Sequence, residues 1–480
     1  MHALALLTGL AALQSWIAPA SAETVLGLAV FSRHGDRTTR RFPGYGLTSL
    51  GHNQNYQVGA HYRSTYLSNS SPLKILGISE DVYVPSQIFA SAPDQKILIE
   101  TSTAFLQGLY PPINREEVLN NGSTITSPLG GYQYVFLRSE EEESPDTIWI
   151  KGDDGCPAYT SSADQYFQTE DFQATAAETQ EFYSRMLSYL TFEGSDWTMT
   201  NMSYRMAYDI YDAIHVASIH NATSPARNVT SADLSRLHAL ASKLEYSLNA
   251  NASSPIRSIG GQALAGAMLR QLNQTIVSRG RTKLSFFGGS YDTMLAFFSH
   301  VAQLDRPNFT YLPDYASTIS FELLVPGNAT EFPRTVDDIG VRFRFWNGSS
   351  LDSEQLMQVY PLFGSSDEVT PWTTFVDKIQ ERAVTSLKQW CGTCGSQKSF
   401  CLQYNQDQLE VALSQFGGNG EGLSKGAIGG ISAVCGAVVS ALACAAAFLL
   451  LKKKNNPSNA RLAVASSPSS STKELNSFQP

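Results

Sequence analysis

The 480-residue sequence has little charge and no excess of basic residues. Charged residues make up 16% of the chain, and the formal net charge is −9. This balance argues against nucleic acid as a partner, because such surfaces need clustered Lys and Arg. Hydrophobic residues account for 42%, which predicts a globular chain with a sizeable core. No internal repeat is visible, so the length fits either three average domains or one α/β domain with a large insertion.

Cysteine is also scarce, with six residues in the chain. In an oxidising compartment, four of them would form two disulfides with three possible pairings. A Cys-x-x-Cys pair also fits a redox or zinc site, but no nearby histidine or second such pair completes a metal tetrad. We therefore favour two disulfides and expect no metal or other cofactor. The four cysteines are Cys156, Cys391, Cys394 and Cys401.

The first 22 residues resemble a signal peptide. An apolar run from Leu4 to Leu10 is followed by small residues at 20–22, the pattern expected at a signal-peptidase site. A retained anchor helix is the alternative, but the apolar run is short and is followed by Pro19. The mature chain is expected to begin at Glu23.

A second hydrophobic segment, residues 426–451, has no charged residue and is long enough to span a membrane. Lys452, Lys453 and Lys454 follow it directly, as expected of a stop-transfer signal that leaves residues 452–480 in the cytosol. A buried core helix is the alternative reading. The glycine-rich stretch 413–425 reads as a linker. We predict a single-pass type I membrane protein of the secretory pathway, with an extracellular or lumenal domain.

Glycosylation motifs support this orientation. Ten Asn-x-Ser/Thr sequences precede the second hydrophobic segment, and none follows it. N-linked glycans are therefore expected, with the asparagines on the surface of the secreted body. The motifs begin at Asn69, Asn121, Asn201, Asn221, Asn228, Asn251, Asn273, Asn308, Asn328 and Asn347.

The most informative stretch is VLGLAVFSRHGDRTTR, residues 25–40. An apolar run that ends in polar residues predicts a buried strand delivering Arg33, His34 and Arg37 to the carboxyl end of a sheet. Two guanidinium groups would bind phosphate oxygens, and an imidazole between them is biased towards its neutral, nucleophilic form. The alternative is a basic surface turn.

This stretch resembles the RHGxR signature of the histidine acid phosphatases, within the phosphoglycerate-mutase-like superfamily. The segments LTSLGHNQNYQVGAHYRSTYL, AFLQGLYPP, WIKGDDGCPAY and GGSYDTML follow in the order seen in that family. The similarity covers about residues 24–400. Together with the anchor segment, it resembles a fungal-type membrane-anchored acid phosphatase.

The resemblance implies an α/β fold, with a central mixed sheet flanked by helices and an inserted α-helical cap domain. The catalytic domain would comprise residues 23–111 and 259–412, and the cap residues 112–258. Periodicity independently predicts helices and strands. We expect strands at 25–31 and 284–287, a hairpin at 317–325 and 341–346, and helices at 51–66, 97–109, 178–192, 204–219, 232–249 (capped by Ser231) and 262–277.

The resemblance also implies the chemistry. His34 would be the nucleophile that forms a phosphohistidine, while Arg33 and Arg37 clamp the phosphate oxygens. Asp292 would protonate the leaving alcohol, which predicts an acidic optimum because the carboxyl must be protonated to donate. Asp292 alternatively caps a helix over residues 293–301.

The chain departs from the family pattern at three positions. Tyr291 replaces a histidine and can donate one phenolic hydrogen bond to phosphate but brings no charge. A further phosphate-binding arginine would align with Ile97, or with Lys96 if the register shifts by one residue. Thr38 replaces a common proline. The leading hypothesis is an acid phosphatase acting on small phosphomonoesters. Phytase-like action on inositol phosphates is a narrower version of this hypothesis. The alternatives are a catalytically weak or inactive pseudophosphatase that binds ligands at the surface, and a purely structural surface protein.

Overall fold

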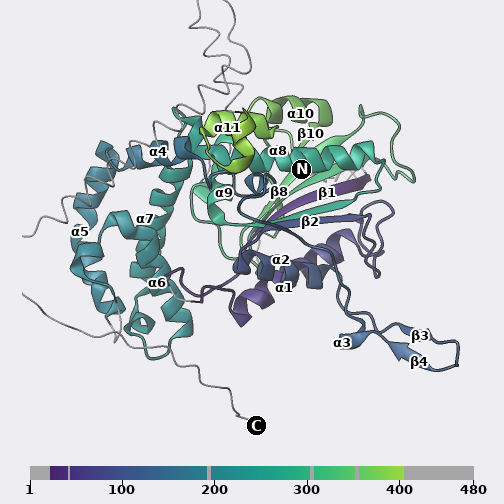
Figure 1. The fold of residues 1–480 in the computed structure, drawn as a ribbon, viewed down its shortest axis with the longest axis horizontal. Coiled ribbons are helices and arrows are strands. Elements are labelled where there is room, and N and C mark those ends of the chain that lie inside the picture. Colours follow the sequence, from purple (N-terminus) through teal and green to yellow (C-terminus); the bar gives the residue numbers. More distant parts are fainter. Residues whose placement is uncertain (1–21, 42–43, 192–195, 303–306, 352–355, 405–480) are drawn as a thin grey trace, which may run out of the picture. The chain divides into compact units, whose positions relative to one another are not determined.

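The computed structural model describes residues 22–41, 44–191, 196–302, 307–351 and 356–404 (Figure 1). The predicted signal peptide up to residue 21, the linker, the segment 426–451 and the tail lie outside the described residues. Among the helices that are described, none is both long enough and apolar enough to cross a membrane. The predicted membrane anchor therefore stays a prediction.

A mixed eight-stranded sheet forms the centre of the fold. Its strand order is β10-β8-β7-β1-β6-β2-β5, with β9 paired to β8. Strands β1, β6, β2 and β5 run parallel, while β7, β8 and β10 add antiparallel pairs. The predicted α/β class with a central mixed sheet is confirmed. The strands are β1 (Glu23–Arg33), β2 (Ile88–Pro93), β5 (Arg138–Glu140), β6 (Leu284–Gly289), β7 (Thr318–Pro326), β8 (Gly340–Trp346), β9 (Gln358–Val359) and β10 (Val369–Pro371).

Helices cover both faces of this sheet (Figure 1). Successive residues of β1 point to opposite faces: Leu28 and Val30 pack with one helical layer, and Ala29 and Phe31 with the other. Because both faces are covered, the middle of β1, residues 25–31, is a continuous run of apolar residues and glycine. One layer holds α1 (Ser49–Tyr66) and α2 (Lys96–Leu109); the other holds α8 (Ile259–Val277), α9 (Tyr291–Ala296), α10 (Trp372–Gln380) and α11 (Leu387–Cys394).

Four further helices form a separate layer beside the sheet, as Figure 1 shows. They share their own apolar cluster, in which Tyr183, Met186 and Leu237 are fully buried. Thr230, rather than the predicted Ser231, caps the last of them, because its hydroxyl accepts a hydrogen bond from the backbone N–H of Asp233 at 3.0 Å. The helices are α4 (Pro157–Tyr166), α5 (Glu170–Leu190), α6 (Ala207–His220) and α7 (Ser231–Asn249).

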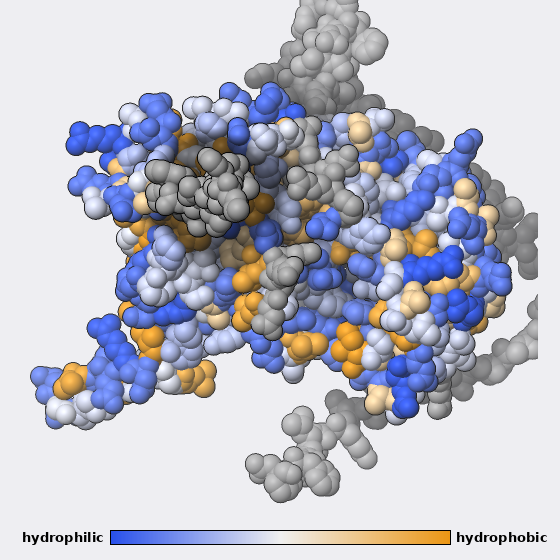
Figure 2. Space-filling view, turned by 180° about the vertical axis from the view of Figure 1, so that it is seen from behind, coloured by the Kyte–Doolittle hydropathy of each residue, from blue (hydrophilic) through white to orange (hydrophobic). Residues whose placement is uncertain are grey.

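The residues before these helices have a different structure. Residues 138–140 form β5, which joins the edge of the main sheet. Strands β3 (Glu116–Val118) and β4 (Thr124–Thr126) form a separate hairpin, followed by the short helix α3 (Pro128–Gly131). The hairpin extends from the body and carries hydrophobic side chains (Figure 2). Within the predicted cap interval 112–258, the helices α4 to α7 therefore begin only at Pro157.

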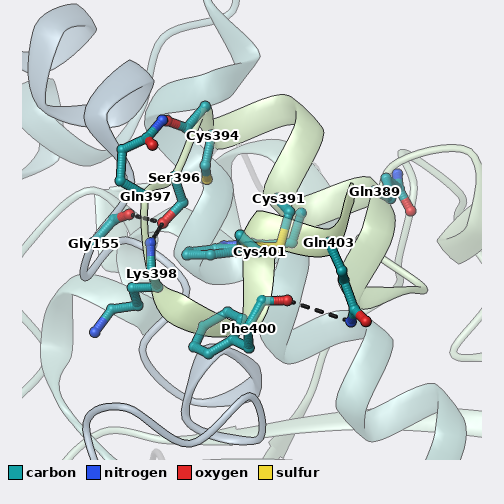
Figure 3. The surroundings of a disulfide bond; sticks show 12 residues. Gly155, Gln389, Cys391, Cys394, Ser396, Gln397, Lys398, Phe400, Cys401 and Gln403 are labelled. Atoms are coloured by element: carbon teal, nitrogen blue, oxygen red, sulfur yellow. Dashed lines mark hydrogen bonds between the residues drawn. A yellow bond between two sulfur atoms is a disulfide. The ribbon is translucent and has the colours of Figure 1, made fainter. Parts of the chain in front are cut away.

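Both expected disulfides form. Cys156 is bonded to Cys394, and Cys391 to Cys401. The Cys391-x-x-Cys394 pair is thus divided between two bridges. Figure 3 shows the surroundings of the bridge between Cys391 and Cys401. The first bridge ties α11 to the start of α4, and the Ser396 hydroxyl adds a 2.7 Å hydrogen bond to the Gly155 carbonyl. The redox and zinc readings of this motif are therefore excluded for the oxidised protein.

Candidate active site

The site is built where β1 ends. The backbone N–H of His34 donates to the carbonyl of Gly289, the last residue of β6, at 3.2 Å. A Cβ atom at Gly35 would lie 2.4 Å from the Gly51 carbonyl oxygen, and one at Gly51 would lie 1.9 Å from the Asp36 carbonyl oxygen. Two glycines therefore allow the signature loop to close on the first turn of α1.

Asp36 fastens this loop to its surroundings. Its buried carboxylate accepts hydrogen bonds from the Thr48 hydroxyl and, at 2.6 Å, from His220 Nε2 at the end of α6. Thr38 donates its backbone N–H to the Gly46 carbonyl at 3.1 Å. A proline at residue 38 would lack this donor, so threonine here serves the fold of the loop.

His34 is held as a neutral imidazole. Its side chain is 2% exposed, and Nδ1 lies 2.9 Å from the Gly35 carbonyl oxygen. Because a carbonyl only accepts, Nδ1 carries the proton, and Nε2 keeps its lone pair. Burial, together with the charges of Arg33 and Arg37, holds the pKa of His34 well below its usual value. The imidazole therefore stays neutral into acidic solution.

Arg33 and Arg37 flank this histidine, and both are anchored at one end. Arg33 Nη1 donates to the Pro313 carbonyl, and its guanidinium lies 4.7 Å from the ring centre of Tyr315. Arg37 Nη2 donates to the Tyr208 hydroxyl at 2.8 Å. In both arginines the buried Nε has no hydrogen-bond partner. Buried polar groups are normally paired, so two oriented N–H donors beside His34 indicate an anion-binding site.

Asp212 of α6 neutralises one of these charges. Its Oδ1 accepts from Arg37 Nη1 at 2.7 Å, and the two side chains are 2% and 1% exposed. Its Oδ2 accepts from the Thr39 hydroxyl at 2.8 Å and from the Arg40 backbone N–H at 3.1 Å. Asp212 both orients Arg37 and reduces the positive potential available to a bound anion.

Asp292 lies at the same edge of the sheet. Strand β6 is parallel to β1, with Gly289 opposite Arg33, so residues 290–292 follow β6 beside the signature loop. The alternative role of Asp292 as helix cap is wrong: α9 begins at Tyr291 with Ser290 at the N-cap position, and Asp292 lies in the first turn. There its Oδ1 accepts from the Thr293 backbone N–H at 2.9 Å.

A second carboxyl group, Asp153, is electrostatically coupled to Asp292. Burial, then the negative charge of Asp292, raises the pKa of Asp153 to about 8. Burial also raises the pKa of Asp292, against the opposing charge of Lys151. Asp153 Oδ1 is buried without a hydrogen-bond partner. Two carboxyl groups that disfavour simultaneous ionisation retain a proton at the site.

Replacing Asp153 by asparagine tests this coupling. Because Asp153, with a pKa of about 8, is uncharged in acid, the neutral asparagine should leave the acid part of the activity profile unchanged. Because the folded-state pKa of Asp153 is raised, the wild type should lose stability relative to the variant as the pH rises from about 4 to about 8. Activity and denaturation profiles against pH measure both effects. An activity profile that moves to lower pH, or identical stability profiles, would show that Asp153 does not keep its proton up to about pH 8.

Tyr291 is packed into the wall of the site. Its ring stacks on Tyr208 at 4.8 Å and lies 5.1 Å from the Arg33 guanidinium. Its hydroxyl is hydrogen-bonded to Glu245 of α7, whose pKa burial raises to about 7. The Arg40 guanidinium, 4.7 Å from the Tyr208 ring centre, brings positive charge to this wall.

The structure does not bring Lys96 to this cluster. Its side chain is 66% exposed and lies 3.8 Å from Glu100, its neighbour one turn along α2. Ile97 is 2% exposed and packs in an apolar cluster with Ala92 and Leu98. Five of the six predicted site residues therefore lie at one edge of the sheet, on the loop after β1 or directly after β6: Arg33, His34, Arg37, Tyr291 and Asp292. The sixth, Lys96, faces the surface.

Three residues of the site were not predicted. Asp153 lies in the segment WIKGDDGCPAY, where two adjacent aspartates between glycines were a visible signal. Asp212 belongs to an otherwise apolar face of α6, with Ile210 and Ile214 as buried neighbours. A buried aspartate on a helix needs a cationic partner, but the sequence does not show which one. Nothing in the sequence marked Glu245 of α7 as a residue of the site. Among the described residues, no group of three or more His, Cys, Asp and Glu could hold a metal ion.

Comparison with known proteins identifies the family. The model of the histidine phosphatase superfamily (branch 2) matches residues 42–334. The chain belongs to this superfamily. The matched range begins just after the loop that carries Arg33 to Arg37. No curated protein gave a significant match.

Two solved structures share the fold. A phytase from Citrobacter braakii is 15% identical, covers 75% of this chain and 98% of its own, and superposes with a TM-score of 0.50. A phytase from Klebsiella sp. ASR1 is 11% identical, covers 76% and 95%, and gives a TM-score of 0.52. At such low identity the likeness concerns the fold.

Proposed function

We propose that this protein is a phosphomonoester hydrolase that works in acid through a phosphohistidine at His34. The observation that carries the proposal is the pair of buried, unpartnered Nε–H donors of Arg33 and Arg37, two residues whose charges act on the neutral imidazole of His34. Membership of the histidine phosphatase superfamily supports it.

The reaction has two steps. His34 Nε2 attacks phosphorus, the ester P–O bond breaks, and Asp292 gives its proton to the leaving oxygen. A water then attacks the phosphorus, Asp292 takes the water proton, and the P–N bond breaks to release phosphate. Arg33 and Arg37 bind the oxygens throughout and stabilise the charge that spreads over them. The raised pKa of Asp292 and the lowered pKa of His34 make both groups competent in acid.

The charges around the site favour substrates with a single phosphate. The two solved structures of similar fold are phytases, but here Asp212 pairs with Arg37, and Glu245 is hydrogen-bonded to Tyr291. A highly phosphorylated ring would bring more negative charge than these partners balance, so we place inositol polyphosphates below simple phosphomonoesters as substrates.

The two disulfides agree with an oxidising compartment. All ten sequon asparagines lie in described parts of the chain, and none is buried. We propose a glycosylated domain facing the lumen or the exterior, anchored through residues 426–451 as a type I membrane protein.

Replacing Asp212 by asparagine should strengthen phosphate binding. The amide keeps the shape of the carboxylate but leaves the charge of Arg37 uncompensated, so competitive inhibition by inorganic phosphate should tighten by roughly tenfold. The variant should also be less stable, because a buried charge has lost its partner. Asp233→Asn is the matched control, since Asp233 of α7 pairs at 3.0 Å with the exposed Arg185 of α5, and neither belongs to the site. Unchanged or weaker inhibition would show that Asp212 does not compete for Arg37.

The direct test of the function is phosphate release by the full-length glycoprotein, purified in mild detergent, from an aryl phosphate, an alkyl phosphate and inositol hexakisphosphate between pH 3 and pH 8. We expect activity in acid, with both monoesters ahead of the hexakisphosphate. Phosphate binding without release from any of the three would overturn the enzyme proposal in favour of a pseudophosphatase.

A further inference from the structure

A groove lined with arginines lies away from the active site, on the sheet face that α8 covers. Its main cavity has a volume of about 440 Å³, and a second cavity of about 210 Å³ adjoins it through shared walls. The floor is Phe89 of β2, which α8 does not fully cover. We call this surface the arginine groove, defined by Ser86, Phe89, Arg138, Arg270, Gln274 and Arg281.

The groove and the active site lie at opposite ends of the parallel strands. Ser86 precedes β2 and Arg281 precedes β6, whereas Arg33 ends β1 and Tyr291 follows β6. A ligand bound there would not contact His34.

Aromatic rings hold two of the three guanidinium groups. Arg138 lies 4.6 Å from the ring centre of Phe89, and Arg270 lies 4.4 Å from that of Trp149. Stacking fixes the plane of a guanidinium while its N–H edges stay available. Within the described residues, no carboxylate lies within 4.0 Å of the guanidinium nitrogens of Arg138, Arg270 or Arg281.

The acidic residues lie at the other end of the groove. Glu140 and Asp146 line the smaller cavity, and their charges act on Arg270. Glu140 accepts a 3.1 Å hydrogen bond from the Ser91 hydroxyl. No carboxylate lines the 440 Å³ cavity itself, where the polar side chains are arginine, glutamine, serine and threonine, all able to donate hydrogen bonds. Such a surface is unusual in a chain of net charge −9.

We propose that the arginine groove binds a small organic anion that carries at least two phosphate or sulfate groups. Arginine forks match the oxygens of both groups bidentately. The cavity volume falls within the range of small-molecule sites. Two separated groups are needed to engage arginines on three different elements: β5, α8 and the loop before β6. The inference is independent of the proposed catalytic function.

The test is isothermal titration of the full-length protein whose active site is saturated with vanadate. The probes are methylenebisphosphonate and a disulfated disaccharide. We expect one site in the wild type, and binding at least tenfold weaker in Arg138→Ala/Arg270→Ala. Arg281→Ala should also weaken binding. Arg281 lines the same cavity but lies in the loop before β6, so this variant changes neither the sheet nor α8. Both variants should hydrolyse an aryl phosphate at the wild-type rate, which separates this site from the catalytic one.

The matched control is Arg185→Ala/Arg236→Ala. These two arginines also lie over a phenylalanine, Phe182, at 5.5 and 4.4 Å, but they belong to α5 and α7. This control should bind as the wild type does. Binding of the bisphosphonate alone identifies a phosphorylated ligand, and binding of the disaccharide alone a sulfated one. No binding of either probe, or equal weakening in the control, would overturn the proposal.

Discussion

Replacing His34 by alanine is expected to reduce hydrolysis of phosphomonoesters by roughly 10⁴-fold or more, towards the detection limit. The change removes the only group proposed to form the covalent intermediate. The neutral Nε2 of His34 has its orientation fixed by the Nδ1 hydrogen bond to Gly35. Arg33 and Arg37 remain, so the variant should still bind inorganic phosphate.

Steady-state kinetics and phosphate titration measure these two properties separately. His300→Ala is a suitable control, because His300 is partly buried at the end of the helix that follows α9 and belongs to no part of the site. The control should keep its activity. A His34→Ala variant with activity within tenfold of the wild type would show that another group attacks phosphorus.

Replacing Asp292 by asparagine should have the second-largest effect, and its size should depend on the leaving group. An amide cannot supply the proton that an alkoxide needs, so kcat for an alkyl phosphate should fall by about 10²- to 10⁴-fold. A nitrophenolate leaves without protonation, so formation of the intermediate from an aryl phosphate should be affected much less. The decline of the wild-type rate at rising pH should follow the raised pKa of Asp292.

The comparison of the two substrates separates chemistry from structural damage. A damaged fold would slow both substrates equally, whereas loss of a general acid slows the alkyl ester selectively. Pre-steady-state release of nitrophenol, together with steady-state hydrolysis of the alkyl ester, gives the ratio. Equal losses for both substrates would remove Asp292 from the role of proton donor.

Much of the fold follows from local patterns. The apolar run of β1, the helices α1, α2 and α6 to α8, and the hairpin of β7 and β8 were predicted close to their observed bounds. Helix α5 was also predicted, but it begins at Glu170, eight residues before the predicted start. Strands β2 and β5 were not predicted. Strand β2 has six residues, of which only Ile88 and Phe89 are large and apolar, and β5 has three polar residues, so neither shows a hydrophobic period. The disulfide pairing also required the structure, since α4 and α11 meet only in three dimensions.

The site divides in the same way. Residues on one loop or directly after a strand, such as His34 and Asp292, could be predicted because parallel strands end at one edge. The pairing of Asp212 with Arg37 could not, because it depends on how α6 docks against the signature loop, 175 residues away in sequence. The outward direction of Lys96 likewise depends on the start of α2.

The central claim is the covalent intermediate on His34, and the most direct measurement is to trap it. The full-length protein is mixed in acid with nitrophenyl phosphate that carries radioactive phosphorus. The reaction is quenched within milliseconds in alkaline denaturant, and the protein is digested. With a good leaving group, hydrolysis of the intermediate limits the rate, so it accumulates. We predict an acid-labile, alkali-stable label on the peptide that contains His34. Turnover with no label on His34, or with label on another residue, would contradict the account.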